Sequence, residues 1–297
     1  EVHDCWERNC RTSEITCHGN GFRGRTTKDE ADMKTIGLVG GMSWESSIEY
    51  YRLINEAVKA KLGGLHSAKC IMHSVDFAEI EPLQHQGKWA KAAEQMIEAA
   101  GHVQDGGADF VVLCTNTMHN VAARVKAAIS IPLLHIADAT AGQIHQAGID
   151  TVGLLGTKFT MEQDFYKGRL EQKGLNVQVP SADDREIVHR IIYEELCLGE
   201  IHEHSRDEYL RIIDQLHAAG AQGVIEGCTE IVMLVQQEHT CVPLFDTTAI
   251  HARQAVAEAG LPLNDFAAYV LRRWYNFQTH NAVLDMILAH PRTRPEP

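Results

Sequence analysis

Short runs of consecutive apolar residues alternate with longer amphipathic stretches along most of the chain. The apolar runs are TIGLVGG, AKCIMHSVD, ADFVVLC and IPLLHIA in the first half, and TVGLLG, GLNVQVP, GVIEGC and VPLFDTT in the second. Between them, helical patterning covers 44–62, 89–105, 119–129, 139–147 and a long stretch at 184–219. Apolar runs that are bounded by turns and followed by helices predict parallel strands covered on both faces. We therefore expect an α/β protein.

The second half of this pattern repeats the first. TIGLVGG at Thr35 returns as TVGLLGT at Thr151, 116 residues later. GGADFVVLCTNT, with Gly107, returns as AGAQGVIEGCTE, with Gly220, 113 residues later. IPLLHIAD, with its proline at 132, returns as VPLFDTTA, with its proline at 243. Three landmarks in one order at nearly constant spacing predict two related lobes, each a parallel sheet flanked by helices, with a site in the cleft between them.

Composition and charge narrow the class of protein. The 297 residues are 44% hydrophobic and 23% charged, which excludes a collagen-like, disordered or small disulfide-stapled chain. A formal net charge of −13 disfavours nucleic acid and anionic membrane surfaces as partners. No run approaches the roughly 18 apolar residues of a membrane helix. We expect a cytoplasmic protein whose eight cysteines are mostly buried thiols.

The two ends differ in composition from the middle of the chain. Residues 1–32 show no apolar periodicity, and MKTIGLVGGMS from Met33 looks like a natural start, so we expect 1–32 to be a disordered extension without a signal peptide. Residues 263–297 are expected to form a helical extension and a tail. Cys5, Cys10, Cys17 and His18 match no standard zinc spacing, so no metal site is predicted.

The candidate chemistry lies where two buried strands end. Setting the repeats on one another places Thr115, Asn116 and Thr117 opposite Cys228, Thr229 and Glu230. The N–H groups and dipole of a helix start bind carboxylates and lower the pKa of a thiol. We therefore expect Cys228 to be a thiolate at neutral pH. The alternative is a structural cysteine at a strand end, and the polar Thr-Glu that follows favours the functional interpretation.

These residues carry a resemblance to a known family. GLVGGMS near the start, CTNTMH in the first half and EGCTE in the second resemble the aspartate/glutamate racemases over about 33–260. The resemblance implies no cofactor, a homodimer, and two lobes that each place a cysteine on one side of the substrate Cα. It also implies that the final strand and helix fold back onto the first lobe. The first lobe would then comprise 33–130 and about 241–262, and the second lobe 131–240.

The first motif departs from the Cys-Asn-Thr pattern of that family. Thr115 stands at the catalytic position, and Cys114 comes one residue early, where strand alternation turns it into the core. By resemblance, Cys228 faces the α-proton of the L-enantiomer. We therefore expect Cys228 to deprotonate L-substrate, and Thr115 or a water that it holds to return the proton. Free enantiomers are equal in energy, so the result is L-selective exchange and not a one-way reaction.

The resemblance also implies how the substrate is held. The expected contacts around the α-carboxylate and the pocket mouth are Met42, Ser43, Asn116, Thr117, Thr229 and Glu230. The segment SVDFAEIEPLQHQ after the second strand contains no Arg or Lys, so Gln84 and Lys158 are the candidates for side-chain recognition. Acidic amino acids are the expected substrates, and uncharged ones such as homoserine are the alternative.

Other functions stay open at this point. Gly37, Gly40 and Gly41 do not form the G-x-G-x-x-G pattern of a dinucleotide site. No lysine stands in a recognisable setting for pyridoxal phosphate. A decarboxylase that uses a single cysteine to protonate a carbanion would suit the same residues. A catalytically degenerate protein that only binds amino acids is the third possibility.

Overall fold

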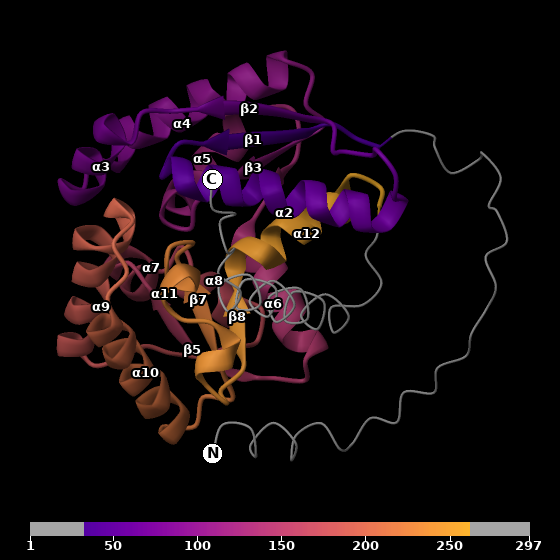
Figure 1. The fold of residues 1–297 in the computed structure, drawn as a ribbon. Helices are drawn as coiled ribbons and strands as arrows, with labels where there is room; N and C mark the ends of the chain where they lie inside the picture. Colours follow the sequence, from indigo (N-terminus) through magenta and orange to yellow (C-terminus); the bar gives the residue numbers. More distant parts are fainter. Residues whose placement is uncertain (1–32, 262–297) are drawn as a thin grey trace, which may run out of the picture. The chain divides into compact units, whose positions relative to one another are not determined.

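The computed structural model describes residues 33–261 (Figure 1). It contains two parallel four-stranded sheets whose strands follow the same order. The first sheet has the order β2-β1-β3-β4 and the second β6-β5-β7-β8, and every paired neighbour is parallel. The strands are β1 (Ile36–Gly40), β2 (Cys70–Ser74), β3 (Phe110–Leu113), β4 (Leu133–Leu134), β5 (Thr151–Gly156), β6 (Asn176–Gln178), β7 (Gly223–Gly227) and β8 (Leu244–Asp246). The predicted α/β class and the duplicated lobes are confirmed.

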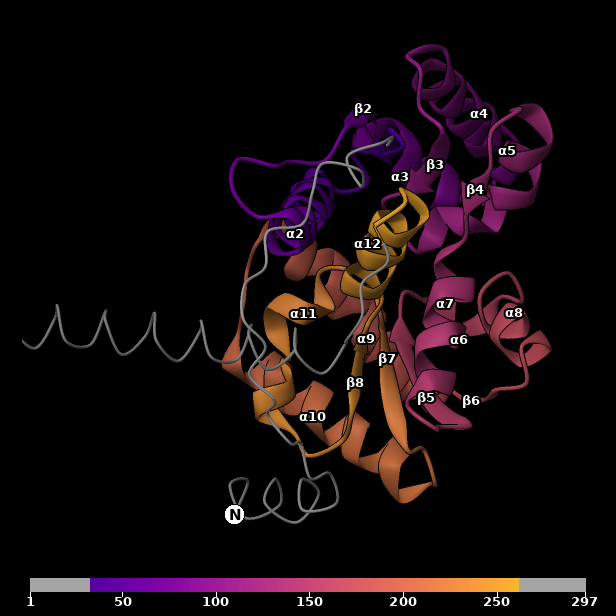
Figure 2. The same cartoon turned by 90° about the vertical axis from the view of Figure 1, so that its right-hand side faces the viewer.

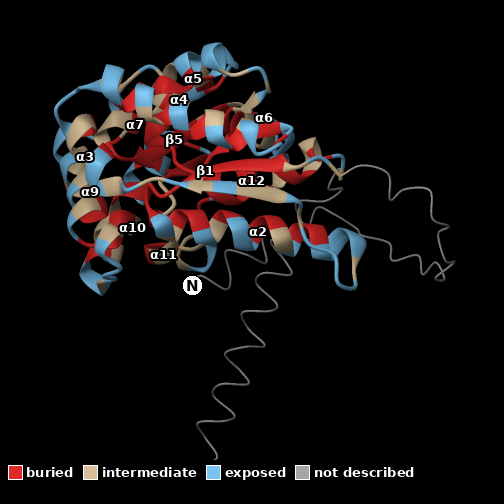
Figure 3. Cartoon of the chain, turned by 90° about the horizontal axis from the view of Figure 1, so that it is seen from above, coloured by how far each residue is buried: buried red, intermediate tan, exposed pale blue. Residues whose placement is uncertain are grey.

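Helices flank both sheets. In the first half they are α2 (Trp44–Leu62), α3 (Phe77–His85), α4 (Trp89–Asp105), η1 (Thr117–Val121), α5 (Ala122–Ala128) and α6 (Ile136–Gln146). In the second half they are α7 (Lys158–Glu162), α8 (Lys167–Gln172), α9 (Ala182–Glu194), η2 (Leu196–Leu198), α10 (Glu203–Ala218), α11 (Ile231–Leu234), η3 (Gln237–His239) and α12 (Thr247–Glu258). Every residue of β1, β3 and β7 is buried, whereas the outer helix faces are exposed (Figure 3). The central strands are therefore the core of each lobe.

Two helical expectations differ from the structure. The stretch 184–219 is not one helix: α9 ends, the short η2 follows, and Gly199 adopts the left-handed conformation before α10 begins. The segment after the second strand, for which the sequence pattern predicted no helix, contains α3. Asp76 caps α3 by accepting a hydrogen bond from the backbone N–H of Ala78. Pro82 and the short length of α3 conceal its helical period in the sequence.

The connections between the lobes place the final strand on the second sheet and the final helix against α2 of the first lobe. β4 pairs with β3 of the first sheet, and the chain then passes to α6, which packs against α8 and α12. β8 pairs with β7 of the second sheet, with Val224 opposite Leu244, and the chain then passes to α12, which packs against α2 (Figure 2). The strand at 244–246 therefore does not join the first lobe, because the free edge of β7 takes it.

Several expectations lie outside the part of the chain that the structure describes. These are the extensions 1–32 and 263–297, with the cysteines at the start of the chain. None of the helices in residues 33–261 has both the length and the apolar character of a membrane span.

Candidate active site

A pocket with about 400 Å³ of unfilled space, its open mouth included, lies at the carboxyl ends of the strands of both sheets. The predicted site residues that line it are Met42, Ser43, Gln84, Thr115, Asn116, Thr117, Cys228, Thr229 and Glu230. They come from the turns after β1, β3 and β7 and from α3. The strand-end residues of the two repeats therefore meet in one pocket.

Lys158 is not among the residues that line this pocket. It begins α7, and its Nζ forms an ion pair with Glu186, while its backbone N–H donates to His189 Nδ1 at 3.2 Å. The ammonium group is thus held by a carboxylate on α9. The structure does not bring Lys158 to the site, which corrects the expectation that it contacts the substrate.

Hydrogen bonds between the lobes join residues that line the pocket. The hydroxyls of Ser43 and Ser46, in the turn that begins α2, both donate to Glu230 Oε1 at 2.9 Å. The hydroxyls of Thr117 and Thr157 lie 3.2 Å apart across the lobe boundary. One carboxylate of the second lobe is therefore fixed by two hydroxyls of the first lobe.

Cys228 is half-buried and donates its S–H to Glu230 Oε2 at 2.9 Å. Burial, the negative charge of Glu230 and the nearby Cys197 raise the pKa of the Cys228 thiol well above its usual range. The expectation of a thiolate in the unliganded protein is therefore wrong. The following α11 has only four residues, so its dipole is outweighed by a carboxylate in direct contact.

Asn116 lines the pocket, and its side-chain amide has a defined orientation. Thr247 Oγ1 donates its single proton to the carbonyl of Glu226 at 2.8 Å, so it accepts from Asn116 Nδ2 at 3.1 Å. The orientation of the amide is thereby fixed, with the nitrogen turned toward Thr247. Asn116 Oδ1 is buried and has no hydrogen-bond partner among the described residues. The free group is thus an acceptor that can bind an N–H of a ligand.

Thr115 lines the pocket on the first-lobe side, whereas Cys114 is fully buried in the core beneath it. The Cys114 thiol lies 3.9 Å from the carbonyl of Val112, and burial raises its pKa. Adjacent residues at the end of β3 thus point in opposite directions. The first lobe presents a hydroxyl, and not a thiol, to the pocket.

Sequence reasoning missed several pocket residues, which are Ser46, Phe77, Thr157, Ile192, Tyr193 and Cys197. The repeat itself could have found Thr157, because it follows the second copy of the first strand. Tyr193 lies on the inner face of α9, and its hydroxyl donates to Gln84 Oε1 at 3.3 Å. The Gln84 amide nitrogen lies 3.1 Å from the sulfur of Met118. No local pattern indicates that α9 meets α3.

Comparison with known proteins places the chain in a family. The family model for Asp/Glu/hydantoin racemases matches residues 39–255. A candidate Asp/Glu racemase from Yersinia pestis is 60% identical, with a TM-score of 0.72 over 76% of this chain and 99% of that one. An aspartate racemase homologue from Pyrococcus horikoshii is 35% identical, with a TM-score of 0.68 over 77% of this chain and 100% of that one.

A more distant match is the broad-specificity amino-acid racemase RacX of Bacillus subtilis, which is 23% identical over 176 residues, 59% of this chain and 74% of that protein. Two parallel-sheet lobes that meet at a shared pocket, together with the family match over most of the described chain, lead to one assignment. The protein belongs to the Asp/Glu/hydantoin racemase family and is an isomerase of the amino acid racemase type.

Proposed function

We propose that this protein is a cofactor-independent amino acid racemase in which Cys228 deprotonates the L-enantiomer and Thr115 serves the opposite face. The observation that carries the proposal is that Thr115 and Cys228, equivalent residues of the two repeats, line one pocket. A substrate Cα between them would meet a sulfur on one side and a hydroxyl on the other. The two faces are then chemically unequal.

Glu230 is the proton acceptor that makes Cys228 a base in this mechanism. The thiol proton passes to Glu230 Oε2, 2.9 Å away, and the thiolate then removes the α-proton of the substrate. The electron pair of the broken bond stays on carbon. A water held by Thr115 protonates the opposite face, and the proton on Glu230 neutralises the hydroxide. The enzyme returns to a neutral thiol beside a carboxylate, so no proton is gained or lost.

The polar groups of the pocket support a free amino acid as substrate. The α-ammonium group would donate to the unpartnered Asn116 Oδ1 and lie in the field of Glu230. The α-carboxylate would accept from N–H groups at the start of η1 and from the hydroxyls of Thr117 and Thr229. An ammonium near Cys228 also stabilises the thiolate. Binding of the substrate would thus help to ionise the thiol.

The charges of the pocket favour an uncharged side chain. Among the described residues that line it there is no Lys or Arg, and Glu230 would repel a second carboxylate. Gln84 and Tyr193 offer neutral hydrogen-bonding groups instead. The name of the RacX relative, a broad-specificity racemase, does not separate uncharged from acidic substrates, and the two more similar structures are named for aspartate or Asp/Glu. We therefore propose uncharged amino acids such as homoserine ahead of aspartate and glutamate.

Proton NMR in D2O, with chiral analysis of the product, tests this function. L-homoserine is expected to lose its α-hydrogen signal faster than it inverts. The Cys228→Ser variant is expected to exchange this hydrogen at least about 100-fold more slowly than the wild type. Equal exchange of D- and L-substrate, or intact exchange in Cys228→Ser, would contradict the assignment of Cys228. Faster exchange of L-aspartate or L-glutamate than of L-homoserine would overturn the proposed side-chain preference alone.

A homodimer is the assembly that we propose. Trp44, Ile48 and Tyr51 recur along one face of α2 and are 62%, 55% and 49% exposed. An apolar stripe on one helix can pair with its own copy about a twofold axis, because the same patch then serves both subunits.

A further inference from the structure

His119 lies in η1, which follows β3, and its ring contacts the backbone carbonyl of Thr115. It is 2% exposed and packs edge to face against two other histidine rings, with centroid distances of 4.6 Å to His135 and 5.7 Å to His251. Of these three rings, none lines the pocket. The proposed mechanism does not use them, although one of them contacts the peptide of Thr115.

The hydrogen bonds of His119 fix its tautomer. Its Nε2 lies 3.2 Å from the backbone N–H of Ile136, which can only donate, so Nε2 carries the lone pair. Nδ1 therefore carries the hydrogen, which it donates to the carbonyl of Thr115 at 2.7 Å. Burial lowers the pKa of His119 to about 4, so the ring is neutral at pH 7. One imidazole thus joins the carbonyl of Thr115 to the first N–H of α6.

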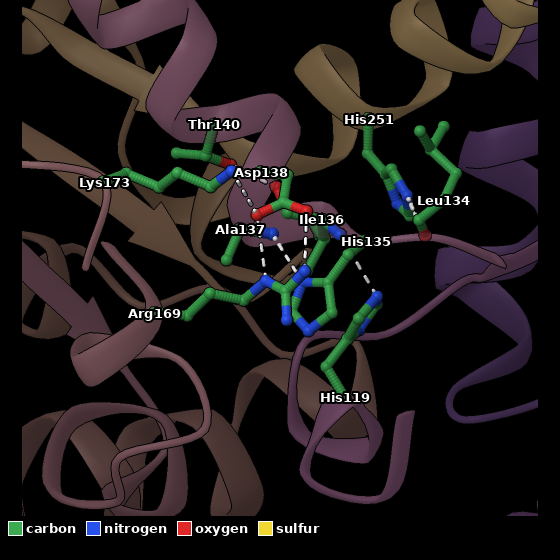
Figure 4. Close-up of polar contacts among 10 residues, drawn as sticks. All are labelled: His119, Leu134, His135, Ile136, Ala137, Asp138, Thr140, Arg169, Lys173 and His251. Atoms are coloured by element: carbon green, nitrogen blue, oxygen red, sulfur yellow. Dashed lines mark hydrogen bonds and ion pairs between the residues drawn. The ribbon is translucent and has the colours of Figure 1, made fainter. Parts of the chain in front are cut away.

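Ile136 belongs to the segment that crosses from the first sheet to the second lobe. Next to it, the carbonyl of Leu134 accepts from His251 Nε2 at 3.1 Å (Figure 4). In the first turn of α6, Asp138 binds the guanidinium of Arg169 through two contacts of 2.9 and 2.7 Å (Figure 4). His119 Nε2 therefore accepts from a segment whose neighbouring residues, Leu134 and Asp138, have hydrogen bonds of their own.

We infer that His119 is a positioning residue that fixes the Thr115 peptide, and with it the side of the pocket opposite Cys228. The direction of a side chain follows from the orientation of its own backbone, so a rotated Thr115 peptide would move the hydroxyl. Cys228 does not depend on this contact, because it lies after β7 and bonds to Glu230. Loss of His119 should therefore slow protonation on the Thr115 side and spare exchange on the Cys228 side.

A pair of amide substitutions separates the two contacts of His119, and the test rests on the proposed racemase function. In His119→Asn the side-chain amide reaches the position of Nδ1 and keeps a donor for the Thr115 carbonyl. In His119→Gln the amide reaches the position of Nε2 and loses that donor. For L-homoserine in D2O, we expect inversion by His119→Gln to fall about 10-fold or more, with exchange within about 2-fold of wild type. His119→Asn should keep both rates within about 3-fold.

Equal losses of exchange and inversion in His119→Gln, or no loss of either, would overturn this inference and leave the proposed function intact. Absence of L-exchange in the wild type would overturn the proposed function, and the inference with it. If His119→Gln does not fold, His119→Leu provides a second test, since it removes the donor to the Thr115 carbonyl and keeps a side chain of similar size. A raised ratio of exchange to inversion supports the inference, and an unchanged ratio overturns it.

Discussion

Glu230 controls the protonation state of Cys228, the candidate base. Glu230 lies two residues after Cys228 and accepts its thiol proton, while two serine hydroxyls hold the other carboxylate oxygen. The carboxylate opposes ionisation of the thiol in the unliganded protein and is also the group that can take its proton. The same contact therefore keeps the Cys228 thiol protonated in the unliganded protein and provides the acceptor for its proton when an amino acid binds.

Glu230→Gln should make Cys228 titrate at lower pH, because the substitution removes the negative charge that opposes the thiolate. The measurement is the pH dependence of iodoacetamide labelling, followed by mass spectrometry of the peptide that contains Cys228. Labelling of Cys241, which is exposed, provides an internal control that should not shift. A midpoint for Cys228 that stays in place or rises would contradict the assigned role of Glu230.

At the scale of elements, the turn between β1 and α2 places the hydroxyls of Ser43 and Ser46 against Glu230 of the second lobe. Ser47 accepts from the backbone N–H of Gly41 at 2.7 Å and donates to the carbonyl of Ser43 at 3.0 Å. Gly41 has φ of +93°, and an added Cβ would lie 2.1 Å from the carbonyl oxygen of Val75. The turn therefore needs glycine both for its conformation and for its close approach to the segment after β2.

Gly41→Ala should lower the free energy of unfolding by roughly 3 kcal/mol, because backbone strain and overlap with Val75 add together. Gly87→Ala is the matched control. Gly87 also has a positive φ, +65°, but nothing lies within 4 Å of an added Cβ, so a loss of about 1 kcal/mol is expected. Urea denaturation of both variants measures the difference. Equal losses of unfolding free energy in the two variants would show that overlap with Val75 does not add to the destabilisation.

At the scale of the molecule, the exposed stripe on α2 predicts the assembly. Trp44→Glu together with Ile48→Lys should convert a dimer to a monomer, because charges replace the apolar centre of the proposed contact. Leu65→Glu is the control, since Leu65 is fully exposed and lies outside the helix. Light scattering after size-exclusion chromatography gives the mass. A monomeric wild type, or a dimer that persists in the double variant, would contradict the proposed interface.

Buried histidines should make the protein sensitive to mild acid. Burial lowers the pKa of His119 to about 4 and that of His251 to about 3, whereas the unfolded chain protonates each near 6.5. Between pH 6.5 and 4 the unfolded state therefore binds more protons, so stability falls as pH falls. From pH 7 to pH 5 each should cost about 2 kcal/mol.

Burial also lowers the pKa of His135 and His189, so urea denaturation at pH 7 and pH 5 measures a loss to which four rings contribute. His251→Gln should reduce this loss by about 2 kcal/mol. The carboxyls of Asp138 and Asp184, whose pKa values are lowered by their arginine partners against the effect of burial, contribute mainly below this range. The same free energy of unfolding at both pH values would show that these rings are not neutral and buried in the folded protein.

Local patterns along the chain determined the parallel sheets, their duplication and the equivalence of Thr115 and Cys228, because buried strands and the polar residues that end them are contiguous in sequence. Only the tertiary structure decided that Glu230 raises the pKa of Cys228, that α3 brings Gln84 to the pocket, that Glu186 holds Lys158, and that β8 joins the second sheet. Each of these depends on burial, on which sheet edge is free or on contacts between groups that no local spacing relates.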